Sequence, residues 1–189
     1  MPLWLRSRKP LAPPHTKWLA DLLASLNQSG PEAQATARYI CEKKVHLGIH
    51  LQPTGARWRP GRRIDLHPRY LEGPPQSLYP LSLVIHEVCH LKQGPATALS
   101  VYGELQAWRA QFGFIRGRGD PYPGATGTDQ AIGQLMSLPR GWDRAVLAKA
   151  RSLMQEFAGA KYRVDLLPLY PLHLEIVWAI TRRKPDDPK

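Results

Sequence analysis

A pair of histidines with a glutamate between them carries the clearest chemistry in this sequence. Residues 85–90 read Ile-His-Glu-Val-Cys-His, so His86 and His90 are four positions apart. On a helix these two imidazoles lie on one face and can bind one ion, whereas Glu87 is rotated by about 100° and lies beside it. Two neutral nitrogens with an open side are typical of catalytic zinc, whose bound water can lose a proton to a neighbouring carboxylate. The pattern predicts Zn²⁺ on His86 and His90, with Glu87 as the general base.

A catalytic zinc needs a third protein ligand, and Glu104 is the best-placed carboxylate. It lies fourteen residues after His90, beyond the turn signal Gly94-Pro95, in a mostly apolar segment with small residues at Gly103 and Ala107. If the two helices pack antiparallel, Glu104 returns to the level of the histidines. The alternatives are that Glu104 is a surface glutamate, or that the third ligand is one of His67, Asp120, Asp129 and His173.

Two further roles stay open from the residues alone. An oxyanion stabiliser should accompany the base, and the chemically able side chains are Tyr79, Tyr102, Tyr122, Tyr170, His67 and His173, among which we single out Tyr102 and His173. Cys89 lies on the same helix and is interpreted as a small buried residue rather than a fourth ligand. The opposing hypothesis for the whole motif is a pair of hydrogen-bonded core histidines without a metal.

The elements around the motif follow from hydrophobic periodicity. Residues 78–93 are apolar around most of a helical circumference, which predicts a helix inside the fold, and a second helix should cover 97–114. Upstream, residues 45–51 alternate with a period of two and 62–66 form a second strand, which predicts a small antiparallel sheet beside the metal-binding helix. We therefore expect an α+β, mainly helical fold.

The rest of the chain is predicted to be helical, in one domain. Helices are expected from Thr16 to Gly30, and over 31–44, 139–158 and 171–181, with a long irregular loop at 116–128. The prolines before Thr16 suggest an extended arm over residues 1–15, and residues 182–189 should form a flexible tail. A single domain is expected over 16–181.

The charge balance favours anionic partners. The chain has 26 Lys and Arg against 15 Asp and Glu, a net charge of +11. Four arginines gather around the predicted turn at Pro60-Gly61 and are candidate contacts for an acidic peptide, an acidic protein or nucleic acid: Arg57, Arg59, Arg62 and Arg63. The strand near 63–66 could bind an extended peptide by strand addition. The alternative is a solvated basic hairpin.

Composition indicates the cellular compartment of the protein. There are only two cysteines, Cys41 and Cys89, no apolar run long enough for a membrane span, and no apolar stretch typical of a signal peptide at the N-terminus. We therefore expect a cytoplasmic protein that does not depend on disulfides or a membrane.

The motif and its surroundings resemble known zinc peptidases. His86-Glu87-x-x-His90 followed by Glu104-x-x-Ala107 looks like the gluzincins, and the segment from Arg57-Trp58 through Ile64-Asp65-Leu66-His67 to the motif is similar to small SprT-like and YgjP-like zincins. The resemblance covers about residues 45–114 and implies a minimal zincin fold, a Zn²⁺ cofactor and peptide-bond hydrolysis. A non-catalytic, basic nucleic-acid-associated or regulatory protein with a structural zinc is the alternative, and a peptidase recruited to nucleic acid combines the two.

Overall fold

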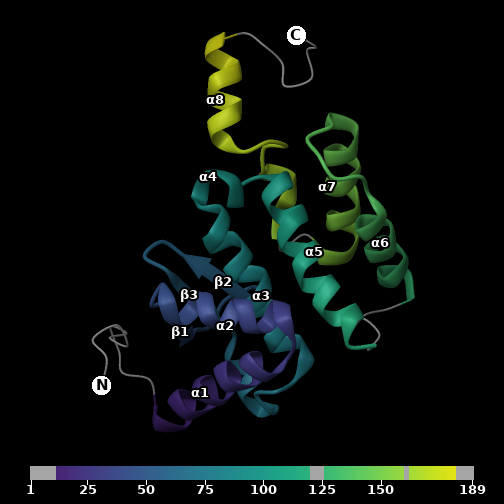
Figure 1. Cartoon of the computed structure of the whole chain (residues 1–189). Helices are drawn as coiled ribbons and strands as arrows, with labels where there is room; N and C mark the ends of the chain where they lie inside the picture. Colours follow the sequence, from purple (N-terminus) through teal and green to yellow (C-terminus); the bar gives the residue numbers. More distant parts are fainter. Residues whose placement is uncertain (1–11, 120–125, 160–161, 182–189) are drawn as a thin grey trace. The chain divides into compact units, whose positions relative to one another are not determined.

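The computed structural model describes residues 12–119, 126–159 and 162–181. It confirms a mainly helical α+β fold with a small sheet (Figure 1). The chain forms two compact units, Met1–Val88 with Phe114–Asp120, and Cys89–Gly113 with Pro121–Lys189, each described by itself below. The arm expected over 1–15 falls mostly outside the described residues, as does the tail at 182–189. The single domain over 16–181 stays a prediction.

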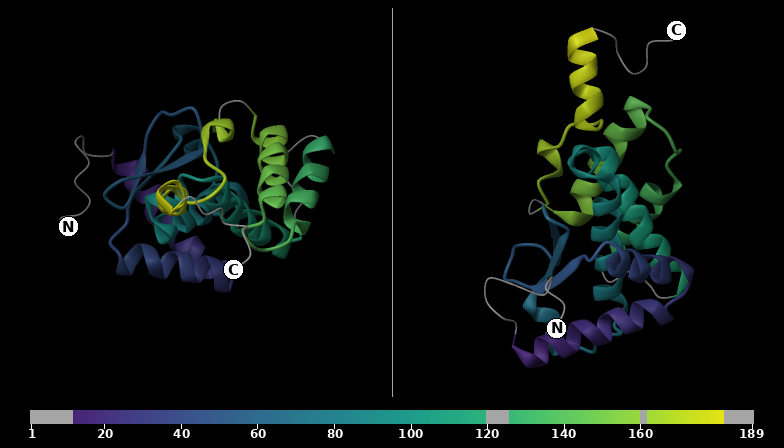
Figure 2. Two further views of the ribbon diagram at one scale, coloured as in Figure 1. Left: turned by 90° about the horizontal axis from the view of Figure 1, so that it is seen from above. Right: turned by 60° about the vertical axis from the view of Figure 1, so that its left-hand side comes forward.

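Two helices open the first unit and lie side by side (Figures 1 and 2). Helix α1 spans Pro13–Gln28 and α2 spans Pro31–Glu42. The predicted start of α1 at Thr16 was wrong, because Pro13 and Pro14 occupy its first turn, where a missing N–H breaks no helical hydrogen bond. The end predicted at Lys44 was two residues too late, since Lys44 has a positive φ of 52°. Both helices bury an apolar face.

The sheet is mixed, which corrects the prediction of an antiparallel one. Its strands are β1 (His46–Ile49), β2 (Ala56–Arg59) and β3 (Arg63–Leu66), in the order β1-β3-β2. Strands β2 and β3 form an antiparallel hairpin, whereas β1 and β3 are parallel. The chain reverses before and after β2, and two reversals return β3 to the direction of β1. The sequence prediction missed β2, taking it for a lead into the turn.

Helix α3 spans Leu78–Gln93, which confirms the predicted bounds. It follows a short 3₁₀ helix, η2 (Pro68–Glu72). From Leu81 to Val88 every side chain is buried, as expected for a helix that is apolar on nearly all sides. The boundary between the two compact units falls within this helix, after Val88.

The structure has two helices where the sequence predicted a single one over 97–114. Helix α4 (Pro95–Ala98) ends before Ser100, and α5 spans Val101–Gly117. The break is stabilised by the Ser100 hydroxyl, which donates to the Thr97 carbonyl oxygen at 2.6 Å and accepts from the Gly103 amide at 3.0 Å. A side-chain oxygen that accepts from a first-turn amide is a helix cap, so α5 starts anew at this point.

The remaining helices are α6 (Thr126–Ser137), α7 (Arg144–Ala158), η4 (Val164–Leu166) and α8 (Leu172–Thr181). Helices α6 and α7, both green, pack side by side (Figure 1). Helix α6 was not predicted, and its first three residues fall in the loop expected over 116–128. Positions 120–125 of that loop lie outside the described residues. Helix α7 starts later than position 139, at the cap Asp143. Among the described residues, no helix combines the length and apolarity needed to cross a membrane.

Candidate metal centre

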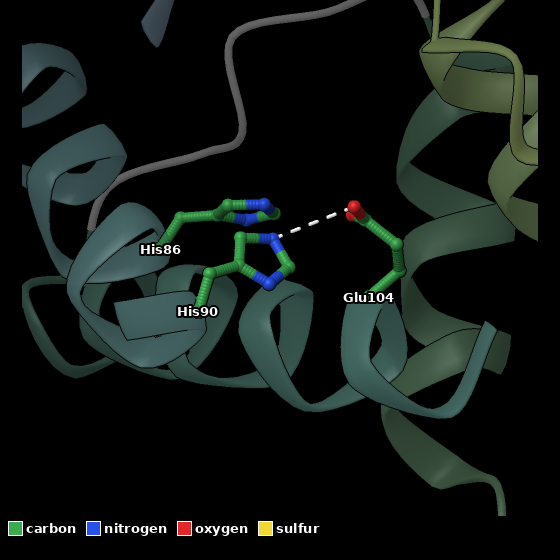
Figure 3. A group of neighbouring side chains, drawn as sticks. All are labelled: His86, His90 and Glu104. Atoms are coloured by element: carbon green, nitrogen blue, oxygen red, sulfur yellow. Dashed lines mark ion pairs between the residues drawn. The ribbon is translucent and has the colours of Figure 1, made fainter. Parts of the chain in front are cut away.

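The structure brings His86, His90 and Glu104 together, as the sequence predicted. Each offers one nitrogen or oxygen, and these atoms all lie within 4.8 Å of one another. Both imidazoles are buried, at 3% and 2% exposure, and His90 Nε2 lies 3.4 Å from Glu104 Oε1. The carboxylate points toward the two rings (Figure 3). Two imidazoles and one carboxylate are a donor set typical of catalytic zinc, so the residues present fit this ion.

The turn between α3 and α5 explains how Glu104 reaches the histidines. Gly94 has a positive φ of 75° at the end of α3, a conformation that glycine adopts without strain. Gly103 then fits against the end of α4, where an added Cβ would lie 2.0 Å from the Thr97 carbonyl oxygen. Glu104 follows directly in the first turn of α5. The small residue at 103 therefore matters for contact with α4.

Gln93 was missed by the sequence prediction and lies at the centre of this arrangement. Its Oε1 is 3.3 Å from His90 Nδ1, on the opposite side of the ring from the atom that faces Glu104. Its Nε2 donates to the Gly103 carbonyl oxygen at 3.0 Å and to Cys89 Sγ at 3.4 Å. The available signal was an amide three residues after a candidate ligand on the same helix, which places the two side chains together.

Glu87 is held beside the histidines by the sheet. Its carboxylate is buried, with the residue 6% exposed, and Oε2 accepts a hydrogen bond from the Trp58 main-chain N–H at 2.7 Å. Strand β2 is an edge of the sheet and pairs with β3 on one side only. The Trp58 amide can therefore donate to Glu87 on α3 without breaking the pairing of β2 with β3. Side-chain patterns in the sequence cannot reveal a main-chain donor, which is why this contact was not predicted.

The rival third ligands are not in this group. The His67 side chain caps η2 by accepting from the Arg69 amide at 3.1 Å. His173 and Asp129 are exposed on α8 and α6, and Asp120 lies outside the described residues. Within the described part of the chain, no other cluster of three or more such side chains has this geometry. Cys89 is half-buried, contacts Gln93 and is not part of the group of His86, His90 and Glu104.

The candidates for oxyanion stabiliser are spread over the fold. Tyr102 lies two residues before Glu104, and its ring stacks on Trp142 with the centroids 4.1 Å apart. His173 is exposed. Burial raises the pKa of Tyr79, so its hydroxyl stays a neutral donor at neutral pH. Tyr170 is buried and Tyr122 lies outside the described residues. No contact in the described structure selects one of them.

The basic hairpin has an internal counter-ion. Asp65 is fully buried, and its two oxygens accept from Arg59 Nε and Arg63 Nε, each at 2.6 Å. An added Cβ at Gly48, the partner of Asp65 on β1, would lie 2.6 Å from one of these oxygens. Arg57 and Arg62 are exposed. Two of the four predicted arginines are thus fixed by a carboxylate and two project outward.

Comparison with models of known protein families, with curated proteins and with solved structures gave no match to this chain.

Proposed function

We propose that this protein is a zinc-dependent metallopeptidase with His86, His90 and Glu104 as metal ligands. The observation that carries the proposal is the convergence of these three donors within 4.8 Å, next to a buried glutamate that does not belong to the ligand group. A zinc site that only stabilises a fold is closed by four protein ligands, whereas a catalytic one keeps a position open. Three donors plus an adjacent base match the second case.

The residues have distinct roles in this proposal. When bound, zinc supplies a Lewis acid that polarises the scissile carbonyl and lowers the pKa of a water toward neutrality. Glu87 accepts the proton of the attacking water on its carboxylate and later transfers it to the leaving amine. The Trp58 amide holds one carboxylate oxygen, which limits rotation of Glu87 and keeps it aligned for both transfers.

The substrate in this proposal is an extended peptide. The strand expected to bind it, β3, is central and paired on both sides, so strand addition there is excluded, and β2 is the sheet edge beside Glu87. A peptide bound along β2 would pass close to the base, with the Trp58 N–H itself engaged by Glu87. The outward Arg57 and Arg62 favour acidic side chains or another anionic partner in the same region of the hairpin. The alternative is a non-catalytic protein that binds nucleic acid through these arginines; the basic hairpin supports it, but it gives Glu87 only a structural contact with Trp58.

Metal analysis and one substitution test the peptidase proposal. Purified protein should contain about one zinc per chain, and Glu87→Gln should keep the zinc while losing hydrolysis of an unfolded protein substrate by several orders of magnitude, as expected when an essential base is removed. Glu156→Gln, at an exposed position on α7, is the matched control and should leave turnover unchanged. Turnover that survives Glu87→Gln would reject the assigned base, and folded protein that takes up no zinc would reject the metal centre.

A further inference from the structure

Gln93 uses both ends of its amide next to the candidate ligands. The Gly103 main-chain oxygen can only accept a hydrogen bond, so the amide nitrogen of Gln93 must face it, at 3.0 Å. The amide oxygen must then face His90 Nδ1, at 3.3 Å. An amide oxygen can only accept, which requires a proton on His90 Nδ1. The ring therefore has Nε2, the atom that faces Glu104, as its ligand atom.

The same side chain connects the two ligand-bearing helices. Gln93 lies in the last turn of α3, and Gly103 directly precedes Glu104 in the first turn of α5. One side chain thus contacts a ligand on α3 and the main chain next to a ligand on α5. The Gly103 amide is itself fixed by the Ser100 hydroxyl at 3.0 Å, so the acceptor for Gln93 is held in place from its other side.

We propose that Gln93 is a positioning residue of the metal centre, which selects Nε2 of His90 as the ligand atom and sets the place of Glu104 through Gly103. Histidine ligands commonly donate their second ring N–H to a fixed acceptor, which orients the ring and raises its basicity. Gln93 supplies this acceptor from the same helix and adds the link to α5. The inference rests on the proposed metal centre.

Two substitutions at position 93 separate the two contacts. Gln93→Met has a similar volume but neither donates nor accepts through an amide, so it should weaken zinc affinity about 10- to 100-fold, the usual cost of losing such a partner. Gln93→Glu keeps an acceptor for His90 but places an oxygen instead of an N–H against the Gly103 carbonyl, so it should keep the first contact and lose the second. Its zinc affinity should lie between those of the wild type and Gln93→Met. Gln130→Met, at an exposed glutamine on α6, is the control and should not change zinc affinity.

The measurements are competitive zinc titration and proton NMR of the zinc-loaded protein. We expect a slowly exchanging His90 Nδ1–H resonance in the wild type and in Gln93→Glu, and its loss in Gln93→Met. Equal zinc affinity of the wild type and Gln93→Met would overturn the inference alone. Absence of the His90 Nδ1–H resonance from zinc-loaded Gln93→Glu would overturn the assignment of His90 as the target of Gln93. A wild type that binds no zinc would instead overturn the metal centre itself.

Discussion

Glu87 and Glu104 are chemically identical side chains that have different roles in the proposed metallopeptidase. Glu104 reaches the two imidazoles from α5, whereas Glu87 lies outside this group and accepts a hydrogen bond from the Trp58 amide. A carboxylate that completes a ligand set stabilises the bound cation, and one that stands beside it can exchange protons. Substitution should therefore affect metal retention at one position and turnover at the other.

Glu104→Ala should weaken zinc retention far more than Glu87→Gln does. We expect a loss on the order of a hundredfold or more, since a direct ligand contributes at least as much as the 10- to 100-fold of an indirect partner. Dialysis against a chelator of known affinity, followed by metal analysis, measures both variants together. The reverse order of zinc loss would move the third ligand to another residue.

The Trp58 amide can be tested by a substitution that removes its N–H. Trp58→Pro deletes the N–H, and an edge strand tolerates proline where the amide points away from its partner strand. A hydrogen bond to a charged group contributes about 1.5–3 kcal/mol, so kcat should fall about 10- to 100-fold with zinc content unchanged. Trp58→Phe keeps the amide and serves as the control. Equal kcat for the two variants would show that Glu87 does not need this donor.

At the scale of elements, the contact of α5 with α4 depends on one missing side chain. Gly103 lies where a Cβ would be 2.0 Å from the Thr97 carbonyl oxygen, but Gly113, on the same helix, has no atom within 4 Å of an added Cβ. The two glycines thus provide opposite tests of the same substitution. Gly103 sits where α5 has to approach α4 closely, and Gly113 does not.

Gly103→Ala should destabilise the protein by about 3 kcal/mol, because main-chain atoms must move to admit the methyl group. Gly113→Ala should instead stabilise it by roughly 0.5–1 kcal/mol, since alanine loses less conformational freedom in a helix. Urea unfolding followed by circular dichroism measures both changes. Similar stabilities for the two variants would mean that α5 can shift away from α4 at no cost.

Periodicity predicted some of these elements well and others not at all. Both ends of α3 were predicted correctly from residues 78–93, because a continuous apolar run followed by Gly94-Pro95 marks where the helix ends. The parallel pairing of β1 with β3 could not be predicted, since it depends on the return path through β2. The break between α4 and α5 depends on the Ser100 hydroxyl, and the role of Gln93 depends on a main-chain acceptor ten positions away. Such contacts are set by the packing of elements and leave no periodic signal.

At the scale of the whole molecule, the excess of positive charge should control association with polyanions. Because the net charge is +11, we expect the logarithm of the DNA-binding constant to fall linearly with the logarithm of the salt concentration. Replacing the exposed Arg57 or Arg62 by Gln should reduce the slope by about one each if both contact phosphate. Lys149→Gln, on the exposed side of α7, is the control. Fluorescence anisotropy across a salt series measures the slopes, and a flat response would exclude nucleic acid as a partner.

His90 and Glu104 are fourteen residues apart, so an ion bound to both would crosslink two segments that are close in the sequence. Closing so short a loop costs little chain entropy, and the first two ligands are already brought together by a single helical turn. Capture of the cation would therefore need only α3 and the start of α5. During synthesis on the ribosome, such a centre could assemble before the chain after residue 119 has emerged.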